Sequence, residues 1–246
     1  MTSARPPRHA RIYQNALDVR DRTHNHADFV KYLTKHGATV STQRTVDAFP
    51  NRDSTTTLAN ESNGSDATTT QNGGVTTQKI DTDEITGDIT LTRFHGGGQV
   101  DTYVDYYFDI ETHQFVGEGN ADHIGVGWND DHYLIIDYTW YCNDSSHIGF
   151  EESEPNGFDH WFNDKWAITT NTTWYDYVGC RIEELSTSQE RYVRGEHLHT
   201  WNDASLAGFG VSPSGGINFN VNNSSSSWEG AYATVRESDA DDVWCC

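Results

Sequence analysis

The segment Glu196-His197-Leu198-His199 has the residue types and spacing best suited to chemistry in this chain. Alternate residues of a β-strand point to the same face, so a strand would place His197 and His199 side by side, about 7 Å apart. Two imidazoles at this spacing can bind a divalent metal ion with a further carboxylate or histidine. The alternative is a pair of exposed strand histidines without a ligand.

The segment is similar to a fragment of the metal-binding pattern of cupins, which are double-sheet barrels. It departs from that pattern at three points: Gly195 lies too close before His197, Asp203 stands where a glutamate is expected, and no second histidine motif follows. The resemblance implies a metal-dependent enzyme on a jelly-roll barrel, with His197 and His199 as ligands. No other cofactor is indicated, because the chain has neither a Walker lysine nor a G-x-G-x-x-G opening a helix.

Two glycine-rich segments are expected to be turns. His95-Gly96-Gly97-Gly98 resembles the oxyanion segment of esterases, but it lies between two alternating segments and the chain has no G-x-S-x-G nucleophile elbow. The segment 210–216 contains Pro213, which argues against a strand-to-helix elbow. Catalysis therefore remains open, and we expect that the chain is not an enzyme.

Four tyrosines could form a binding surface on a sheet. Tyr103 and Tyr107 lie on one face of an alternating segment, and Tyr133 and Tyr141 lie on one face of another. Aromatic rows beside Asp and Asn can bind a glycan or another protein, because rings stack on apolar faces while polar neighbours bind hydroxyls. The alternative is that a second layer covers these rows.

The chain has four cysteines, Cys142, Cys180, Cys245 and Cys246, which allow three disulfide pairings. Cys142 and Cys180 each lie in a strand-like segment, so a cross-strand disulfide and buried thiols are both open. No C-x-x-C pair indicates zinc.

The periodicity of the chain changes after an N-terminal head. In residues 1–50, Asn25 is expected to cap a helix with Phe29 and Leu33 on one face and Gly37 after its end, followed by an extended piece at 39–46. Residues 51–78 are rich in Thr, Ser and Asn and are expected to be a disordered linker. Residues 1–78 could then be removable, with 1–50 as a pro-segment.

From residue 79 to 246 the pattern has a period of two. Val104, Tyr106 and Phe108 are expected to point inward and Asp105 and Asp109 outward. A hairpin is expected at 129–131, with a core face of Leu134, Ile136, Tyr138, Trp140 and Cys142. Further strands are expected at 85–94, 166–172, 174–182, 191–199, 217–221 and 230–236. These segments predict an all-β fold, an antiparallel β-sandwich or jelly-roll-like barrel of about eight to eleven strands.

The charge is unevenly distributed. Residues 1–52 contain nine Lys and Arg and four Asp and Glu, whereas the rest contains seven and thirty-three, and the formal net charge of the chain is −21. With only four Lys, this composition is typical of a halophilic archaeon or its virus, because salt screens the repulsion between carboxylates. The acidity disfavours nucleic acid as a partner, and the chain has no apolar run of the roughly 18 residues that a membrane span needs.

The location is less clearly indicated. The beginning of the sequence has no apolar segment or twin arginine that would mark a secretory signal, so a cytoplasmic protein, an upstream start and another export route remain open. Asn-x-Ser/Thr sequons favour the cell surface or the exterior, although a chain rich in these residues also forms them by chance. They lie at Asn60, Asn63, Asn143, Asn171, Asn222 and Asn223.

Three functions follow from these observations. The first is a non-enzymatic surface or secreted β-sandwich that binds a glycan or a cell-envelope protein. The second is the metal-dependent enzyme, and the third is a secreted peptide antibiotic or toxin precursor with a removable head. The sequence leaves the ligand, the cysteine connectivity, the oligomeric state and the natural start open.

Overall fold

The structure is a computed structural model, and it describes residues 8–47, 85–96, 99–110, 121–136, 141–142, 147–163, 174–185, 189–200, 204–223, 227–229 and 233–239. Two helices precede a series of strands in these residues. The elements are α1 (Arg8–Thr23), α2 (His26–Lys35), β1 (Ala38–Asp47), β2 (Ile85–Gly96), β3 (Gln99–Ile110), β4 (Asp122–Trp128), β5 (Tyr133–Ile135), β6 (Tyr141–Cys142), β7 (Ile148–Glu154), β8 (Gly157–Phe162), β9 (Trp174–Glu184), β10 (Tyr192–Thr200), β11 (Ser205–Val211), β12 (Ile217–Asn222), β13 (Ser227–Glu229), β14 (Ala233–Arg236) and the 3-10 helix η2 (Glu237–Asp239).

Two antiparallel sheets form the body of the molecule. The first sheet has the order β1-β2-β3-β9-β5, with β6 also paired to β9. The second sheet has the order β13-β10-β4-β8-β7, with β14 also paired to β10. The sheets do not close into a barrel, which confirms the predicted all-β class and favours the sandwich.

The main core lies between the two sheets. The first sheet contributes Ile89, Val104 and Phe108, all at most 2% exposed, and the second contributes Val126 and Trp128, which are fully buried. The predicted inward row of β3 is therefore confirmed. Alternating apolar residues on facing strands build such a core because successive side chains of a strand point to opposite faces.

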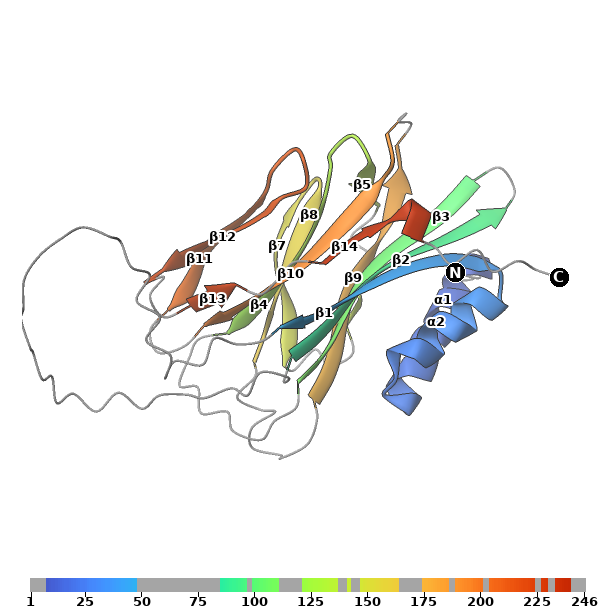
Figure 1. Cartoon of the computed structure of the whole chain (residues 1–246), viewed down its shortest axis with the longest axis horizontal. Coiled ribbons are helices and arrows are strands. Elements are labelled where there is room, and N and C mark those ends of the chain that lie inside the picture. The colour runs from blue at the N-terminus through green and yellow to red at the C-terminus, as the bar shows by residue number, and fades with distance from the viewer. Residues whose placement is uncertain are drawn as a thin grey trace, which may run out of the picture.

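Each sheet is also covered on its outer face, so the molecule has four layers (Figure 1). Helices α1 and α2 pack on the first sheet, where Leu17, Phe29 and Leu33 join Tyr103 in a second buried cluster. The β11–β12 hairpin packs on the second sheet, where Phe209 and Phe219 join Leu198. None of the helices in the described ranges is long and apolar enough to cross a bilayer.

The helical head follows the sequence signals closely. Asn25 caps α2, and its side chain accepts a hydrogen bond of 2.8 Å from the backbone N–H of Ala27. Gly37 has φ +87° just after α2, which a residue with a side chain rarely adopts. Strand β1 then runs antiparallel to β2 from Ala38 opposite Phe94 to Asp47 opposite Ile85. The predicted second helix and extended piece are confirmed.

The hairpin predicted at 129–131 is wrong. Strand β4 pairs with β8 and β10, whereas β5 pairs with β9, so this turn carries the chain from the second sheet to the first. The predicted core face is wrong at Leu134, which is 41% exposed whereas Tyr133 is fully buried. Cys142 is partly buried against the main core, and Tyr138 and Trp140 lie outside the described residues. The indole of Trp128 donates a hydrogen bond of 2.9 Å to the carbonyl oxygen of Tyr133, which fixes this crossing.

The glycine-rich segment 210–216 lies at a turn, as predicted. Strands β2 and β3 pair as far as Gly96 opposite Gln99, and Gly97 and Gly98 lie outside the described residues. Between β11 and β12, Ser212 N–H donates to the Gly216 carbonyl and Gly215 N–H donates to the Ser212 carbonyl, both at 2.8 Å. Strands β7, β8, β11 and β13 were not predicted, and the strand predicted at 166–172 lies outside the described residues.

Candidate functional site

Three of the four predicted binding-site tyrosines come together beneath α1. Tyr103 and Tyr107 are only 6% and 2% exposed, and Tyr141 is partly buried beside them. The ring of Tyr13 from α1 stacks on Tyr103, with centroids 4.1 Å apart and planes 13° apart. These rings therefore do not form an open surface, because the helical head covers the outer face of the first sheet. The covered row is the alternative that the sequence left open.

The same correction applies to Asp105, which was expected to face solvent. Its side chain is fully buried, and its Oδ1 lies 2.7 Å from Nη1 of Arg20, which is also fully buried. The hydroxyl of Tyr13 donates to Asp105 Oδ2 at 2.9 Å. The hydroxyl oxygens of Tyr13 and Tyr141 are 2.5 Å apart. Burial of an ion pair without solvent is tolerated because hydrogen bonds of this kind compensate the lost hydration.

Aromatic rings enclose the guanidinium of Arg20. Its Cζ lies 4.1 Å from the ring centroid of Phe29, 3.9 Å from that of Tyr177 and 5.4 Å from that of Tyr107. We call Arg20, Asp105, Phe29, Tyr107 and Tyr177 the Arg20 cage. Aromatic faces attract a cation most strongly where water is excluded, so this cage combines a carboxylate with cation–π contacts.

Burial shifts the protonation of the groups around the cage. It raises the pKa of the Tyr13 hydroxyl, and the Asp105 carboxylate raises it further. Burial would lower the pKa of Arg20, but the charge and hydrogen bond of Asp105, together with Tyr13 and Tyr177, outweigh this effect and raise it. Burial and the nearby positive charges of Arg20 and Arg44 lower the pKa of His26 well below its usual value. The cage therefore holds a charged guanidinium beside a neutral imidazole.

Other contacts attach the helices to the same face. His26 Nε2 and Thr90 Oγ1 are 2.9 Å apart, and His9 Nδ1 and Asp101 Oδ2 are 2.8 Å apart. The hydroxyl of Tyr175 donates to the backbone carbonyl of Asp21 at 3.1 Å. Polar contacts thus accompany the apolar cluster along the whole length of α1.

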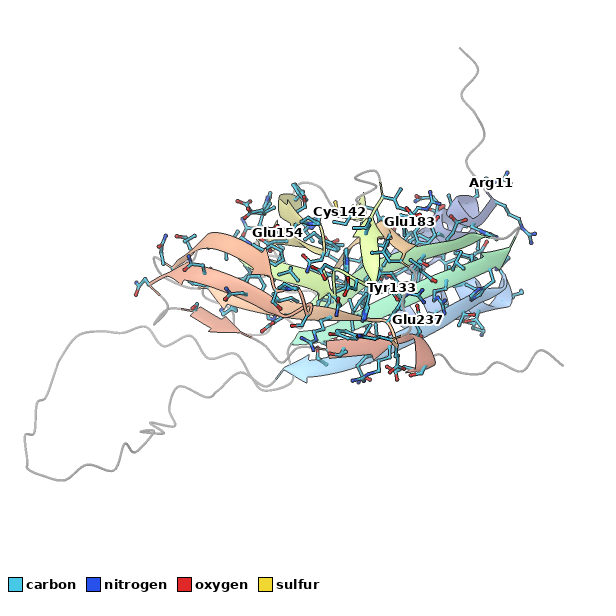
Figure 2. The ribbon with its side chains drawn as sticks, turned by 90° about the horizontal axis from the view of Figure 1, so that it is seen from above. Arg11, Tyr133, Cys142, Glu154, Glu183 and Glu237 are labelled. Carbon is cyan, nitrogen blue, oxygen red and sulfur yellow. The ribbon has the colours of Figure 1, made fainter. Side chains whose placement is uncertain are left out.

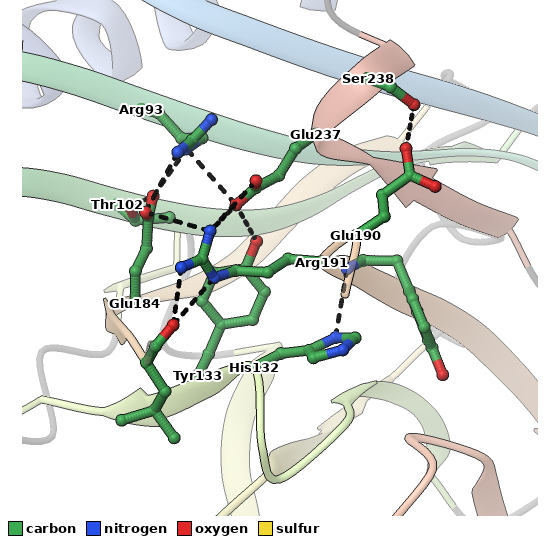
Figure 3. A network of polar contacts seen from close by, with 11 residues as sticks. Arg93, Thr102, His132, Tyr133, Glu184, Glu190, Arg191, Glu237 and Ser238 are labelled. Atoms are coloured by element: carbon green, nitrogen blue, oxygen red, sulfur yellow. Dashed lines mark hydrogen bonds and ion pairs between the residues drawn. The ribbon is translucent and has the colours of Figure 1, made fainter. Parts of the chain in front are cut away.

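A second polar cluster closes one end of the space between the sheets (Figure 3). Arg93 of β2 donates two hydrogen bonds to Glu184 of β9, at 2.6 and 3.1 Å. Thr102 of β3 donates to the same carboxylate at 2.7 Å. Arg191, just before β10, donates to both oxygens of Glu237 at 3.3 Å. We call these five residues, together with Tyr133, the Arg93 cluster.

Tyr133 was a predicted binding residue, and the structure places it in the Arg93 cluster instead. Its hydroxyl donates to Glu237 Oε1 at 3.0 Å, and burial, followed by the charge of Glu237, raises its pKa. Burial opposes ionisation of Glu184, but the hydrogen bonds from Arg93 and Thr102, together with the charges of Arg93 and Arg191, outweigh it and lower its pKa. The cluster joins strands of both sheets, and a bidentate Arg–carboxylate pair gives it a defined geometry.

The predicted metal ligands His197 and His199 share one face of β10, as expected, but both are only 2% exposed. His199 Nδ1 lies 2.9 Å from Asp122 Oδ2, and the backbone N–H of Thr200 donates to Asp122 Oδ1 at 2.7 Å. The alternative of two exposed histidines is therefore wrong. Within the described residues, no group of three or more His, Cys, Asp or Glu is arranged to hold a metal ion. Asp203 lies outside them.

A second histidine–aspartate pair lies on the opposite face of this sheet. His123 Nδ1 is 3.0 Å from Asp159 Oδ2, and both side chains are buried. A carboxylate at Nδ1 fixes the orientation of an imidazole, which is useful both for a reactive histidine and for a structural one. The two pairs cross-link neighbouring strands of the second sheet, since Asp122 and His123 belong to β4.

The predicted disulfide between Cys142 and Cys180 does not form. Cys142 lies opposite Val178 of β9, and neither cysteine takes part in a disulfide. Burial raises the pKa of the Cys180 thiol. Cys245 and Cys246 lie outside the described residues, so their pairing stays a prediction.

Sequence reasoning did not find the Arg20 cage, although a signal was present. The buried residues of α1 are Tyr13, Ala16, Leu17 and Arg20, which follow the spacing of one helix face. An arginine in the apolar stripe of a helix needs a buried partner, and Asp105 lies in a strand row with tyrosines on both sides. The match becomes evident only when the helix is placed on the sheet.

Comparisons with known proteins give little further information. No protein-family model and no curated protein matches the chain. Among solved structures, the fold is similar to a chain described as "Pore forming protein", with a TM-score of 0.35 and 8% identity over 80% of this chain and 89% of that chain. A likeness at this level does not bear on the function of the chain.

Proposed function

We propose that this chain is a non-enzymatic β-sandwich that acts by binding at the surface or exterior of a halophilic archaeon or its virus. The observation that carries the proposal is the placement of charge. Some of the arginines turn inward to carboxylates, as in the pairs Arg20–Asp105, Arg93–Glu184 and Arg191–Glu237. The excess of negative charge is left on the surface, where a high salt concentration would screen it.

Exposed carboxylates lie on several elements of the sandwich. They include Asp130 and Asp131 in the turn between the sheets, Glu151 and Glu152 on the edge strand β7, and Glu183 on β9. Figure 2 labels Glu154 of β7 and Glu183 of β9, which belong to different sheets of the sandwich. These described carboxylates thus lie on separate elements. This distribution is typical of an adaptation to solvent.

The buried polar groups have a structural role, and this supports a binding function. The Arg20–Asp105 pair joins α1 to β3, and the Arg93–Glu184 pair joins β2 to β9. These groups hold distant segments together, which is a structural task. Phe150 on the edge strand β7 is 43% exposed, and an edge strand with an exposed ring can contact a partner protein. A glycan or an envelope protein is therefore the proposed partner class.

Circular dichroism at different KCl concentrations tests the proposal. In dilute buffer we expect the β-sheet signal to be lost, and in molar KCl we expect it to return, because the Debye length falls to about 3 Å at 1 M. A variant with Asp130→Asn, Asp131→Asn, Glu151→Gln and Glu152→Gln should fold at a lower KCl concentration, because it carries four fewer negative charges at exposed positions.

A control variant separates charge from general effects of substitution. Gln14→Asn, Asn15→Gln, Gln43→Asn and Asn218→Gln change four exposed neutral residues and should leave the salt midpoint unchanged. The proposal is contradicted if the wild-type chain is equally stable at 10 mM and 2 M KCl, or if the two variants shift the midpoint equally.

A further inference from the structure

Arg20 occupies its cage as a ligand occupies a binding site. Its guanidinium is fully buried between the rings of Phe29 and Tyr177, at 4.1 and 3.9 Å, and it contacts the carboxylate of Asp105 at 2.7 Å. Asp105 and Tyr177 belong to the first sheet, whereas Arg20 belongs to α1. The sheet therefore presents a carboxylate and an aromatic face to a planar cation that comes from another element.

The carboxylate is held in place by more than Arg20. Tyr13 donates to Asp105 Oδ2 at 2.9 Å, while Arg20 contacts Oδ1. Removal of the Arg20 side chain would therefore leave an oriented, buried carboxylate with one oxygen facing an empty space. A buried anion without a cation is costly, so either a proton or a cation from solution would then neutralise Asp105, whose pKa burial already raises.

The contacts also define which cation fits. Nε and Nη2 of Arg20 are buried without a hydrogen-bond partner among the described residues, whereas Nη1 lies 2.7 Å from Asp105 and 3.3 Å from His26 Nδ1. The site thus holds the guanidinium against the faces of two aromatic rings and by the contacts of Nη1 at one edge of the group. A flat cation with apolar faces meets these conditions, whereas a strongly hydrated ammonium does not.

We propose that Asp105, Tyr177 and Phe29 form a guanidinium-binding site, which Arg20 fills as a tethered ligand and which accepts a guanidinium compound from solution when Arg20 is removed. The ligand class is a monoalkyl guanidinium, the group that ends an arginine side chain. The proposal is independent of the proposed function, since it concerns a buried site and not the acidic surface.

Chemical rescue of an Arg20→Ala variant tests the site. N-ethylguanidinium contains the atoms that the substitution removes beyond Cβ, so it should rebind between the rings and beside Asp105. We expect the thermal midpoint of the variant to rise by about 3 to 6 °C at a concentration ten times the dissociation constant. Wild type should show no such rise. Total ionic strength is held constant with KCl.

Three controls define the chemistry. Arg11→Ala removes an exposed arginine of the same helix, whose side chain extends outward in Figure 2, and should show no rescue. N-ethylurea, which is flat but neutral, and ethylammonium, which is charged but not flat, should raise the Arg20→Ala midpoint much less. The double variant Arg20→Ala, Asp105→Asn should lose most of the rescue, because the carboxylate is gone.

The result is informative even if Arg20→Ala does not fold in buffer. The same titration is then followed by near-ultraviolet circular dichroism, which reports the packing of the tyrosines, and N-ethylguanidinium should restore that signal. The proposal is overturned if N-ethylguanidinium, at concentrations that leave wild type folded, stabilises Arg20→Ala no more than ethylammonium or N-ethylurea does. Equal rescue of Arg11→Ala would overturn it as well.

Discussion

Individual residues of β3 show that one strand contributes side chains to two buried regions, one on each face of its sheet. Phe108 faces the core between the sheets, whereas Asp105 belongs to the outward row, faces α1 and pairs with Arg20. Both rows are buried, but one is apolar and the other contains tyrosines and a carboxylate. The outward row is therefore an interface for a second layer, which explains why a polar composition there does not mean exposure to solvent.

The two faces of β3 predict unequal effects of substitution. Phe108→Asp places a charge in the apolar core and should lower the free energy of unfolding by at least about 4 kcal/mol. Asp109→Asn keeps an oxygen that can accept the 2.5 Å hydrogen bond from Thr86, so it should cost at most about 1 kcal/mol. Urea unfolding in molar KCl measures both. Equal midpoints would mean that the two faces are assigned incorrectly.

His26 predicts a loss of stability in acid. Its folded-state pKa is lowered, chiefly by burial and then by Arg20 and Arg44, so the unfolded chain binds a proton more readily than the folded one. The contribution of neutral His26 is complete above the unfolded pKa of about 6.5 and decreases as the pH falls below it. Between pH 7 and pH 5 the free energy of unfolding should decrease by about 2 kcal/mol from this residue.

Comparison of two variants isolates the effect of His26. His26→Gln should be less stable than wild type at pH 7 but should lose less stability on acidification. Gln14→Asn, at an exposed position of α1 without an ionisable side chain, should keep the wild-type pH dependence. The explanation fails if urea midpoints of wild type and His26→Gln have the same slope with pH.

At the scale of the elements, glycines decide how closely the β11–β12 hairpin packs on the second sheet. A Cβ at Gly125 would lie 2.9 Å from side-chain atoms of Ile217 and Phe219, whereas a Cβ at Gly208 would have no atom within 4 Å. Gly125→Leu should therefore displace the hairpin and cost about 1 to 3 kcal/mol. Gly208→Ala should change stability by less than about 1 kcal/mol.

Hydrogen exchange shows more specifically which element the substitution at Gly125 displaces. The amides of β11 and β12 should lose protection in Gly125→Leu, while those of β2 and β3 keep it, because the first sheet does not contact the hairpin's apolar cluster. If protection falls uniformly in both sheets, the hairpin is not the element that the glycine accommodates.

The sequence was a good guide wherever a local pattern determined an element. The cap at Asn25, the stop at Gly37 and the alternation of Val104, Tyr106 and Phe108 each specify local geometry, and the structure confirms them. The strand β7 was missed because its residues Glu151 and Glu152 interrupt the alternation; its register shifts between Phe150 and Glu152. A bulge in an edge strand interrupts the two-residue alternation from which a strand is predicted.

The candidate site depended on long-range contacts and could not be predicted in the same way. Tyr103 and Tyr107 were correctly placed on one face, but nothing local showed that α1 covers that face. The turn at 129–131 was correctly placed, yet its neighbouring strands joined different sheets because β4 and β5 found other partners. Pairing between strands far apart in sequence is determined by the whole packing.

At the scale of the whole molecule, charge and layers are arranged together. The basic head lies against the first sheet of an acidic sandwich, and its Arg20 enters the interior while Arg11, Arg22 and Lys31 remain exposed. The chain thus carries its positive charge on the helical layer and its excess of carboxylates on the sandwich. Salt should affect these two layers in different ways, because the head carries a net positive charge and the sandwich a net negative one.

The ladder between β1 and β2 has a consequence for any processing of the chain. The two strands pair over their full length, from Ala38 opposite Phe94 to Asp47 opposite Ile85, although many residues separate them along the chain. A peptide bond cut between Asp47 and Ile85 would therefore leave two fragments that stay bound as one particle and part only in denaturant. Maturation by cleavage alone would not release the N-terminal fragment; an unfolding step would have to follow.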